Sequence, residues 1–345
     1  MLNMLNEANF PRRLVIGTGI VLVLLLTWQL VDLLLLVFAS VLVAIFFRSL
    51  ANVIAKQTTI SPSWSLAIAV VLVAVFFGLI TTLFGTTIRQ NVSTLMEELP
   101  AAWQAIRGRI GEVRWLVDAL DRAGQALLTS NMMSRIGGAL GAVMGAFTNI
   151  FLVLFAGLYI AAQPGLYRSG FLKLVPPQDR PRIDATLVRC GVFLRNWLLG
   201  QLIAMVVVGT LTWAGLQLLQ VPSALALGLF AGLAEFVPIL GPIAAAIPAL
   251  IIAFSQDSRL ALWVLAMFVV IQQLEGNVLQ PIIQRRMVAL PPAVTLFAVI
   301  AFAILFGAMG ALLAAPLAVV TLVLVQDLYI APIEEAATEQ NNDSS

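Results

Sequence analysis

The sequence has no histidine and a single cysteine, Cys190, among its 345 residues. The absence of histidine excludes imidazole metal sites, histidine proton relays and Ser-His hydrolases. One cysteine cannot form a disulfide within the chain or a thiolate metal cluster, and we interpret it as a small apolar core residue. No GxxxxGK[ST] nucleotide-binding motif occurs, so we do not expect this chain to use ATP hydrolysis as its source of energy. We therefore expect no cofactor, no metal site and no enzymatic activity.

Charged residues are also scarce, at 10% of the chain, whereas 61% of the residues are apolar. Ordinary soluble domains carry about 25% charged residues, so this chain has too little polar surface to cover a water-soluble globule. Several apolar runs exceed the roughly 18 residues that indicate a membrane span. The composition therefore predicts a polytopic all-α membrane protein in contact with lipid. The net charge of only +2 indicates no nucleic-acid partner.

The apolar runs predict about six full spans, at residues 14–30, 32–49, 63–88, 141–163, 196–218 and 259–283. The first two spans form one apolar stretch, which a polar group at Gln29–Asp32 divides. A single helix over 14–47 would be about 51 Å long, against a hydrocarbon core of about 30 Å. We therefore expect the chain to turn near Asp32, and we assign 1–88 to the N-terminal spans.

Residues 89–140 differ in kind from the spans, because they mix charges of both signs with a regular apolar seam. Apolar side chains recur from Val92 to Leu120 with alternating spacings of four and three, which is typical of a heptad pattern. We predict a soluble amphipathic helical insert. This apolar seam either packs on the membrane-spanning part of the same chain or lies in the membrane–water interface. Alternatively, it joins the subunits of a homo-oligomer.

The remaining domain boundaries follow from where the charged residues lie in the sequence. Residues 141–195 hold the fourth span and a basic cytoplasmic loop, 196–330 form a C-terminal transport unit, and 331–345 are a polar tail that we expect to be disordered. Basic residues favour the cytoplasmic side of a membrane. Placing both termini in the cytoplasm puts Arg12, Arg48 and the 164–195 connection there, and it puts the insert outside.

The C-terminal unit contains a candidate repeat. Residues 221–254 align with 290–323 without gaps at an offset of 69, and each segment is too long for one span. Each also has helix-disfavouring residues near its middle: Pro238, Gly241 and Pro242 in the first, and Gly307 and Gly310 in the second. Broken helices at corresponding points of two halves are typical of transporter binding sites. We expect two broken, re-entrant hairpins that are inverted relative to each other.

A few polar residues lie inside these apolar segments, where an ionisable group costs several kcal/mol unless it is paired or hydrated. Glu235 lies beside the first break, and Glu275 lies in the span at 259–283. Glu275 and Gln272 share one helix face at i, i+3, whereas Gln273 and Asn277 pair at i, i+4. Such residues either bind a solute or cation, with the two glutamates as carriers, or form a buried network that joins helices.

Four motifs stand out in the second half of the chain: GQL at 200–202, GLFAGLAEFVPILGPIAAAIPA at 228–249, QQLEGNVLQPII at 272–283 and LFGAMGALLAAPLA at 305–318. Together they resemble the motifs of the autoinducer-2 exporter family of bacterial membrane permeases. The family's usual tyrosine in the proline-glycine turn is Ile239 here, a change that bears on solute or ion preference. The resemblance implies an inner-membrane exporter with functional positions at Gln201, Glu235, Pro238, Gly241, Pro242, Glu275, Asn277 and Pro281.

The leading interpretation is a secondary transporter that moves a small solute such as autoinducer-2, coupled to an ion or proton gradient. The resemblance also includes relatives linked to sodium or lithium–proton antiport, so an antiporter is the first alternative. A channel or an oligomeric membrane scaffold is the second alternative, because the heptad pattern of the insert suits oligomerisation.

Overall fold

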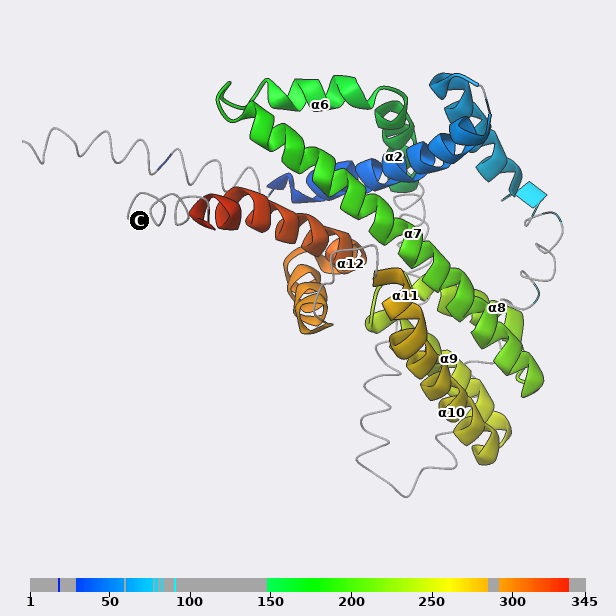
Figure 1. The fold of residues 1–345 in the computed structure, drawn as a ribbon. Helices are drawn as coiled ribbons and strands as arrows, with labels where there is room; N and C mark the ends of the chain where they lie inside the picture. The colour runs from blue at the N-terminus through cyan, green and yellow to red at the C-terminus, as the bar shows by residue number, and fades with distance from the viewer. Residues whose placement is uncertain are drawn as a thin grey trace, which may run out of the picture.

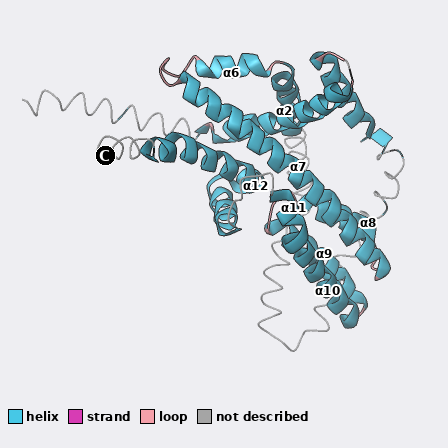
Figure 2. Ribbon diagram, viewed as in Figure 1, coloured by secondary structure: helices cyan, strands magenta, loops and turns pink. Residues whose placement is uncertain are grey.

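The computed structural model describes residues 29–58, 60–76, 148–284 and 292–334, together with the isolated positions 18, 78, 79, 82 and 90. Within this part of the chain all regular elements are helical, and Figure 2 shows no strand among the described residues. The predicted all-α class is therefore confirmed for them. Most of the span predicted at 14–30, nearly all of the insert at 89–140 and most of the tail at 331–345 lie outside the described residues.

The elements keep the labels of Figure 1. They are α2 (Val31–Gln57), α6 (Pro164–Leu172), α7 (Arg180–Leu218), α8 (Ala224–Ala234), α9 (Leu240–Gln256), α10 (Ser258–Leu274), the π-helix η1 (Glu275–Leu279), α11 (Gln280–Gln284), α12 (Pro292–Val325) and the π-helix η2 (Gln326–Ile330). Two further apolar helices, Pro62–Phe76 and Thr148–Ala162, carry no label.

Four described helices are long and apolar enough to cross a membrane, or five if Thr148–Ala162 and α6 count as one bent span. Three of them, α2, α7 and Ser258–Ile282, cover the spans predicted at 32–49, 196–218 and 259–283. The fourth, Ala293–Glu334, has 42 residues. A straight helix of that length would measure about 63 Å, which is twice the hydrocarbon core. The total of six spans stays a prediction.

Helix α7 begins much earlier than the predicted span, at Arg180, and its 39 residues correspond to about 58 Å of helix. Pro181 at its first turn has the fixed φ that suits a helix start. Five charged residues of the predicted basic loop lie in the first part of α7, namely Arg180, Arg182, Asp184, Arg189 and Arg195, and the apolar residues of the predicted span follow. The segment predicted as a loop at 164–195 is therefore mostly helical, with α6 before α7.

Helix α7 runs the length of the molecule and contacts two groups of helices (Figure 1). At its first half, Leu194, Trp197 and Leu198 pack with apolar residues of α2 and of the second part of α12. At its far end, Leu216 packs with apolar residues of α8, α9 and α10. The described chain thus has a core around the first half of α7 and another around its end.

Helices α8 and α9 form a short hairpin on α7. Leu227 near the start of α8 and Ile252 near the end of α9 belong to the same buried cluster, so the two arms run antiparallel. The arms have 11 and 17 residues, or about 16 and 25 Å of helix, and each is shorter than the hydrocarbon core. The predicted break within 221–254 is confirmed, whereas its re-entrant placement in a membrane stays a prediction.

Helix α12 is also broken, as predicted. Gly307 has φ 63° and ψ −150°, which interrupts the helix within Pro292–Val325. Figure 1 shows the orange part of α12 turning away from its red part. The positive φ suits glycine because it has no Cβ. Both candidate repeat halves therefore contain an interrupted helix, and their inverted relation remains a prediction.

Candidate functional site

The tip of the α8–α9 hairpin is a tight turn over residues 235–239. Pro238 lies in this turn, and Ile239 has a positive φ of 70°, an unusual conformation for a β-branched residue. Gly241, at the start of α9, packs directly against the backbone of Ala234, since a Cβ there would lie 2.0 Å from the Ala234 carbonyl oxygen. Glycine therefore allows the second arm to begin this close to the end of the first.

Glu235 is the first residue of this turn, and its side chain is buried with 2% of its surface exposed. The amide of Gln201, on α7, donates a hydrogen bond to the backbone carbonyl of Glu235. This carbonyl lies at the end of α8, where carbonyl groups lack helical partners. Gln201 thus fixes the hairpin tip to α7, and both predicted residues lie in one place.

Glycines bring α8 close to α7. A Cβ on Gly209 would lie 3.1 Å from the Cα of Gly232, and a Cβ on Gly228 would lie 2.5 Å from Cβ of Trp213. Small residues allow helix backbones to approach in this way in membrane proteins. The close contact holds α8, and hence Glu235, against the middle of α7.

Glu275 opens the π-helix η1 and is 8% exposed. The amide of Gln272 donates to one of its carboxylate oxygens at 3.1 Å, and the amide of Gln280 donates to the other at 3.1 Å. The widened π turn brings position i+5 onto the same side as Glu275. Pro281 follows at the second position of α11, and proline cannot donate the backbone hydrogen bond of an α-helix.

Glu235 and Glu275 meet although they lie 40 positions apart in the sequence. Their carboxyl groups are near enough to interact electrostatically with each other. Oε2 of Glu235 is buried and has no hydrogen-bond partner among the described residues. Two adjacent carboxylates repel each other, and a low dielectric strengthens the repulsion. The pair therefore places two acidic groups side by side in a poorly hydrated part of the protein.

The second break lies near the same part of α7. Phe306 and Met309 flank Gly307, and they pack on the cluster that contains Trp197, as does Phe236 beside Glu235. The rings of Trp197 and Phe236 are 5.7 Å apart in an edge-to-face arrangement. Gly310 is buried, and a Cβ there would lie 2.1 Å from the carbonyl oxygen of Phe302. Both breaks thus contain a glycine pressed against the carbonyl of a preceding arm.

Other predicted residues lie at the margin of this arrangement. Gln273 and Asn277 bond to each other at 3.4 Å, as their spacing predicted, and both are exposed. Pro242 is partly exposed at the start of α9, and Gly307 is exposed at the second break. Among the described residues, no three or more Asp, Glu or Cys side chains come together as they would around a metal ion.

Sequence reasoning passed over two contributors to the site. Gln280 lies five residues after Glu275, a spacing that does not suit an ordinary α-helix, so its bond depends on the π turn. Trp197 lies four residues before Gln201 on α7, and this spacing places both on one helix face. That spacing is the signal that would have included Trp197.

Comparison with known proteins identifies the family. The model of the AI-2E family transporters matches residues 18–330. The chain belongs to the AI-2E transporter family. The match includes both broken segments, Glu235 and Glu275. The predicted resemblance is confirmed, and the protein is a multi-pass transporter of the bacterial inner membrane.

Individual relatives are more distant. The chain is 26% identical to the predicted transport protein YueF of Bacillus subtilis over 260 residues, which cover 70% of each protein. It is 28% identical to the predicted transport protein YrrI of the same organism over 200 residues, or 58% of this chain and 56% of YrrI. It is 26% identical to the AI-2 transport protein TqsA of Escherichia coli over 260 residues, or 74% of this chain and 72% of TqsA.

Proposed function

We propose that this family member is a secondary transporter that exports a small polar solute, such as autoinducer-2, and couples its movement to a proton or cation held by Glu235 and Glu275. The observation that carries the proposal is the contact between these two buried carboxyl groups at the first helix break. The name of TqsA supports autoinducer-2 as the first solute to test. The network that binds Glu275 supports a site that is built for a carboxyl group.

The chemistry of coupling follows from charge. With both carboxylates ionised, the pair carries two negative charges in a poorly hydrated place, which is costly unless a positive charge is added. One proton or one monovalent cation removes most of that repulsion. Its arrival and departure therefore change how strongly the tip of the α8–α9 hairpin is held against η1. That change is the event that we couple to solute movement.

The geometry also supports a moving part. The α8–α9 hairpin and α10 share one core at the end of α7, whereas α2 and the second part of α12 share another around its first half. The carboxyl pair lies where elements of the first group meet the middle of α7. We propose that the hairpins enter from opposite sides of the membrane and that the C-terminal unit moves against α2 during transport.

Flux through purified protein tests the proposal. Full-length protein is reconstituted in vesicles loaded with autoinducer-2, and solute release is measured with and without an imposed pH gradient. We expect saturable, gradient-dependent release by the native protein. Glu235→Gln and Glu275→Gln should each abolish the gradient dependence, because a neutral amide cannot exchange a proton or attract a cation.

Gln273→Ala is the matched control, because Gln273 lies on the same span but is exposed and bonded to Asn277. It should leave the gradient dependence intact. Thermal unfolding of each variant in detergent shows that the fold is retained. Normal gradient-driven release by both glutamine variants would mean that the carboxyl groups only join helices, and the proposal would be wrong.

An antiporter for sodium or lithium is the alternative that the same site favours, since carboxylate and amide oxygens are suitable ligands for hard cations. Proton-driven sodium uptake by the same vesicles, without autoinducer-2 movement, would establish it. An ohmic current without saturation would instead identify a channel. We also propose that the 89–140 insert joins subunits, which cross-linking of the native and insert-deleted proteins would test.

A further inference from the structure

A pocket lies away from the carboxyl pair, where the end of α6, the start of α7 and η2 meet. Its volume is about 340 Å³, which falls in the range of small-molecule sites. Its lining consists of Phe171, Val175, Asp179, Arg182, Ile183 and Leu328. Four of these side chains are apolar and two are of opposite charge. The lining of the pocket therefore combines an apolar surface with one positive and one negative side chain.

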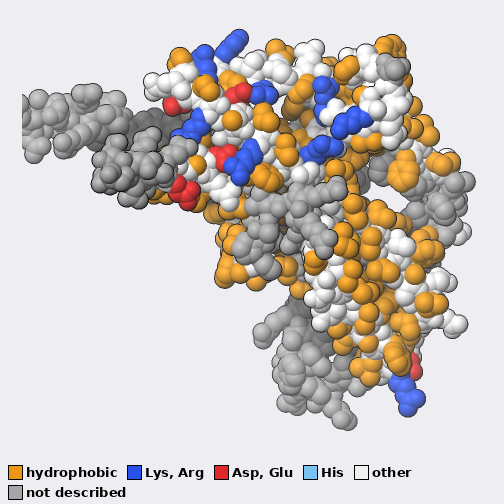
Figure 3. Space-filling view, viewed as in Figure 1, with side chains coloured by type: hydrophobic (Ala, Val, Ile, Leu, Met, Phe, Trp, Pro, Cys, Tyr) orange, Lys and Arg blue, Asp and Glu red, His pale blue; other side chains and the backbone are white. Residues whose placement is uncertain are grey.

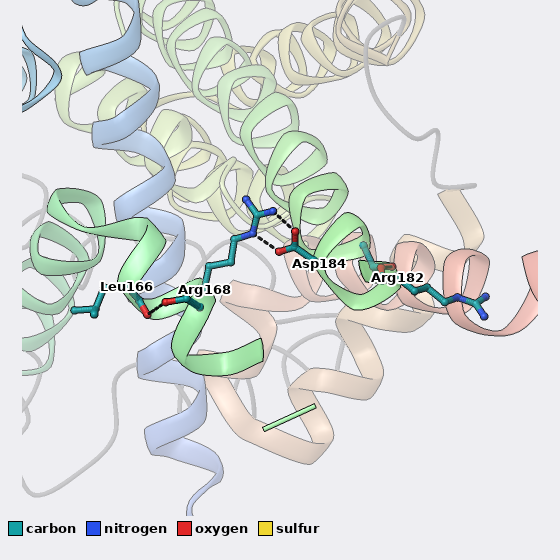
Figure 4. Close-up of polar contacts among 6 residues, drawn as sticks. Leu166, Arg168, Arg182 and Asp184 are labelled. Carbon is teal, nitrogen blue, oxygen red and sulfur yellow. Dashed lines mark hydrogen bonds and ion pairs between the residues drawn. The ribbon is translucent and has the colours of Figure 1, made fainter. Parts of the chain in front are cut away.

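Arg182 supplies the positive charge of this pocket. Its guanidinium donates hydrogen bonds to the main-chain carbonyl of Asp327, which is a neutral acceptor. The two neighbouring arginines differ, because Arg168 pairs with the carboxylate of Asp184 and Arg189 pairs with the carboxylate of Asp327. Figure 4 shows the Arg168–Asp184 pair and the side chain of Arg182 pointing away from it. Arg182 thus keeps its charge and has further donors for a ligand.

The same pattern holds for three further arginines on α2 and α7. Arg180 donates to the carbonyl of Val175, and Arg195 donates to the hydroxyl of Ser49. Arg48 donates to the carbonyl of Ala161. All of these acceptors are neutral, so they position the guanidinium groups without cancelling their charge. Figure 3 shows Lys and Arg side chains gathered over the part of the molecule that contains α6 and the start of α7.

Helix α6 marks the level of the membrane surface at this place. It bends by 87° from the apolar helix Thr148–Ala162, so it runs across the direction of that span. None of its residues is buried, and Leu166, Tyr167 and Phe171 are all exposed by 47% or more. A short helix with exposed aromatic and aliphatic side chains beside basic residues is typical of the membrane interface.

We propose that this pocket binds phosphatidylglycerol from the surrounding membrane. The phosphodiester pairs with Arg182, because basic pockets between helices suit anionic lipid headgroups. An acyl chain follows the apolar wall formed by Phe171, Ile183 and Leu328. The carboxylate of Asp179 would repel a bare phosphate, but it accepts hydrogen bonds from the glycerol hydroxyls of this headgroup. The lining thus suits a headgroup that carries a phosphate for Arg182 and hydrogen-bond donors next to it for Asp179, as phosphatidylglycerol does.

Lipid binding to the purified full-length protein tests this proposal without reference to transport. Native mass spectrometry is run with phosphatidylglycerol, phosphatidic acid or phosphatidylcholine added at equal concentrations. We expect phosphatidylglycerol to be retained most strongly. Arg182→Gln should weaken its binding about tenfold or more, as expected for loss of a charge-assisted bond. Asp179→Asn should remove the preference over phosphatidic acid.

Arg259→Gln is the control, since Arg259 lies at the start of α10, at the far end of the molecule from α6 (Figure 1). It should leave binding unchanged. Because Arg182 also bonds to Asp327, Arg182→Lys is included, and it should retain part of the binding. Equal binding by the native protein and Arg182→Gln would overturn the proposal. Displacement of the lipid by millimolar inorganic phosphate, or equal retention of phosphatidylcholine, would do the same.

Discussion

Gly241 offers the sharpest test of how the first helix break is built. A Cβ at this position would lie 2.0 Å from the carbonyl oxygen of Ala234, 2.5 Å from its carbonyl carbon and 2.9 Å from the nitrogen of Glu235. All three atoms belong to the backbone, so no side-chain rotation relieves the overlap. Gly241→Ala must therefore push α9 away from the end of α8.

The magnitude follows from comparison with ordinary overpacking, which costs about 1–3 kcal/mol when neighbouring side chains adjust. Here the backbone itself must shift, so we expect a loss of about 3 kcal/mol or more in the free energy of unfolding. The shift also displaces Glu235, which follows Ala234 directly at the C-cap of α8. Gradient-driven solute release should therefore fall together with stability.

Gly191→Ala is the matched control for this substitution. Gly191 lies within α7, and a Cβ there would meet nothing within 4 Å. Alanine is favoured over glycine inside a helix by about 0.5–1 kcal/mol, so this variant should be as stable as the native protein or slightly more stable. The two variants are compared by thermal unfolding in detergent. Equal melting temperatures would refute the close contact between Gly241 and Ala234.

Two further predictions concern the hairpin and its place in the membrane. Gln201→Leu removes the side-chain hydrogen bond to the Glu235 carbonyl and should cost about 1–3 kcal/mol in the free energy of unfolding, because a buried acceptor loses its donor. Gln217→Leu, at an exposed position of the same helix, should cost little, and similar losses for the two variants would contradict the role of Gln201. Single cysteines that replace Ser258 and Ala289 should react with membrane-impermeant reagents from opposite sides of the membrane, because the span at 259–283 lies between them. Labelling of both cysteines from one side would rule out the proposed hairpin topology.

Much of this organisation could be predicted from local sequence. Pro238, Gly241, Gly307 and Gly310 interrupt long apolar runs, and the structure breaks both helices at these places. The i, i+3 spacing of Gln272 and Glu275 predicted a shared face, and the two side chains are hydrogen-bonded. These features depend on residues within one or two helical turns of each other, so a pattern in the sequence is sufficient to find them.

The positions at which the helices begin were harder to predict from the sequence. The sequence placed the start of the fifth span at 196, where the charged residues end, whereas α7 begins at Arg180. Charge marks the limit of the apolar segment, but it does not end a helix, because a helix continues into water whenever its backbone bonds and side-chain pairs allow it. The Arg168–Asp184 pair joins α6 to this extension, and it depends on a fold that returns α6 along α7.

The sequence alone determined that this is a membrane transporter with two interrupted helices and two acidic residues inside apolar segments. Hydropathy, helix-breaking residues and family motifs are properties of short sequence segments, so they could be recognised without knowing how the helices pack. Only the tertiary structure decided that Glu235 and Glu275 lie close enough to interact, that Gln201 bonds to the hairpin tip, and that Gln280 bonds to Glu275 through a π turn. Those contacts depend on how α7, α8 and α10 pack together, and packing between distant segments leaves no periodic pattern in the residues themselves.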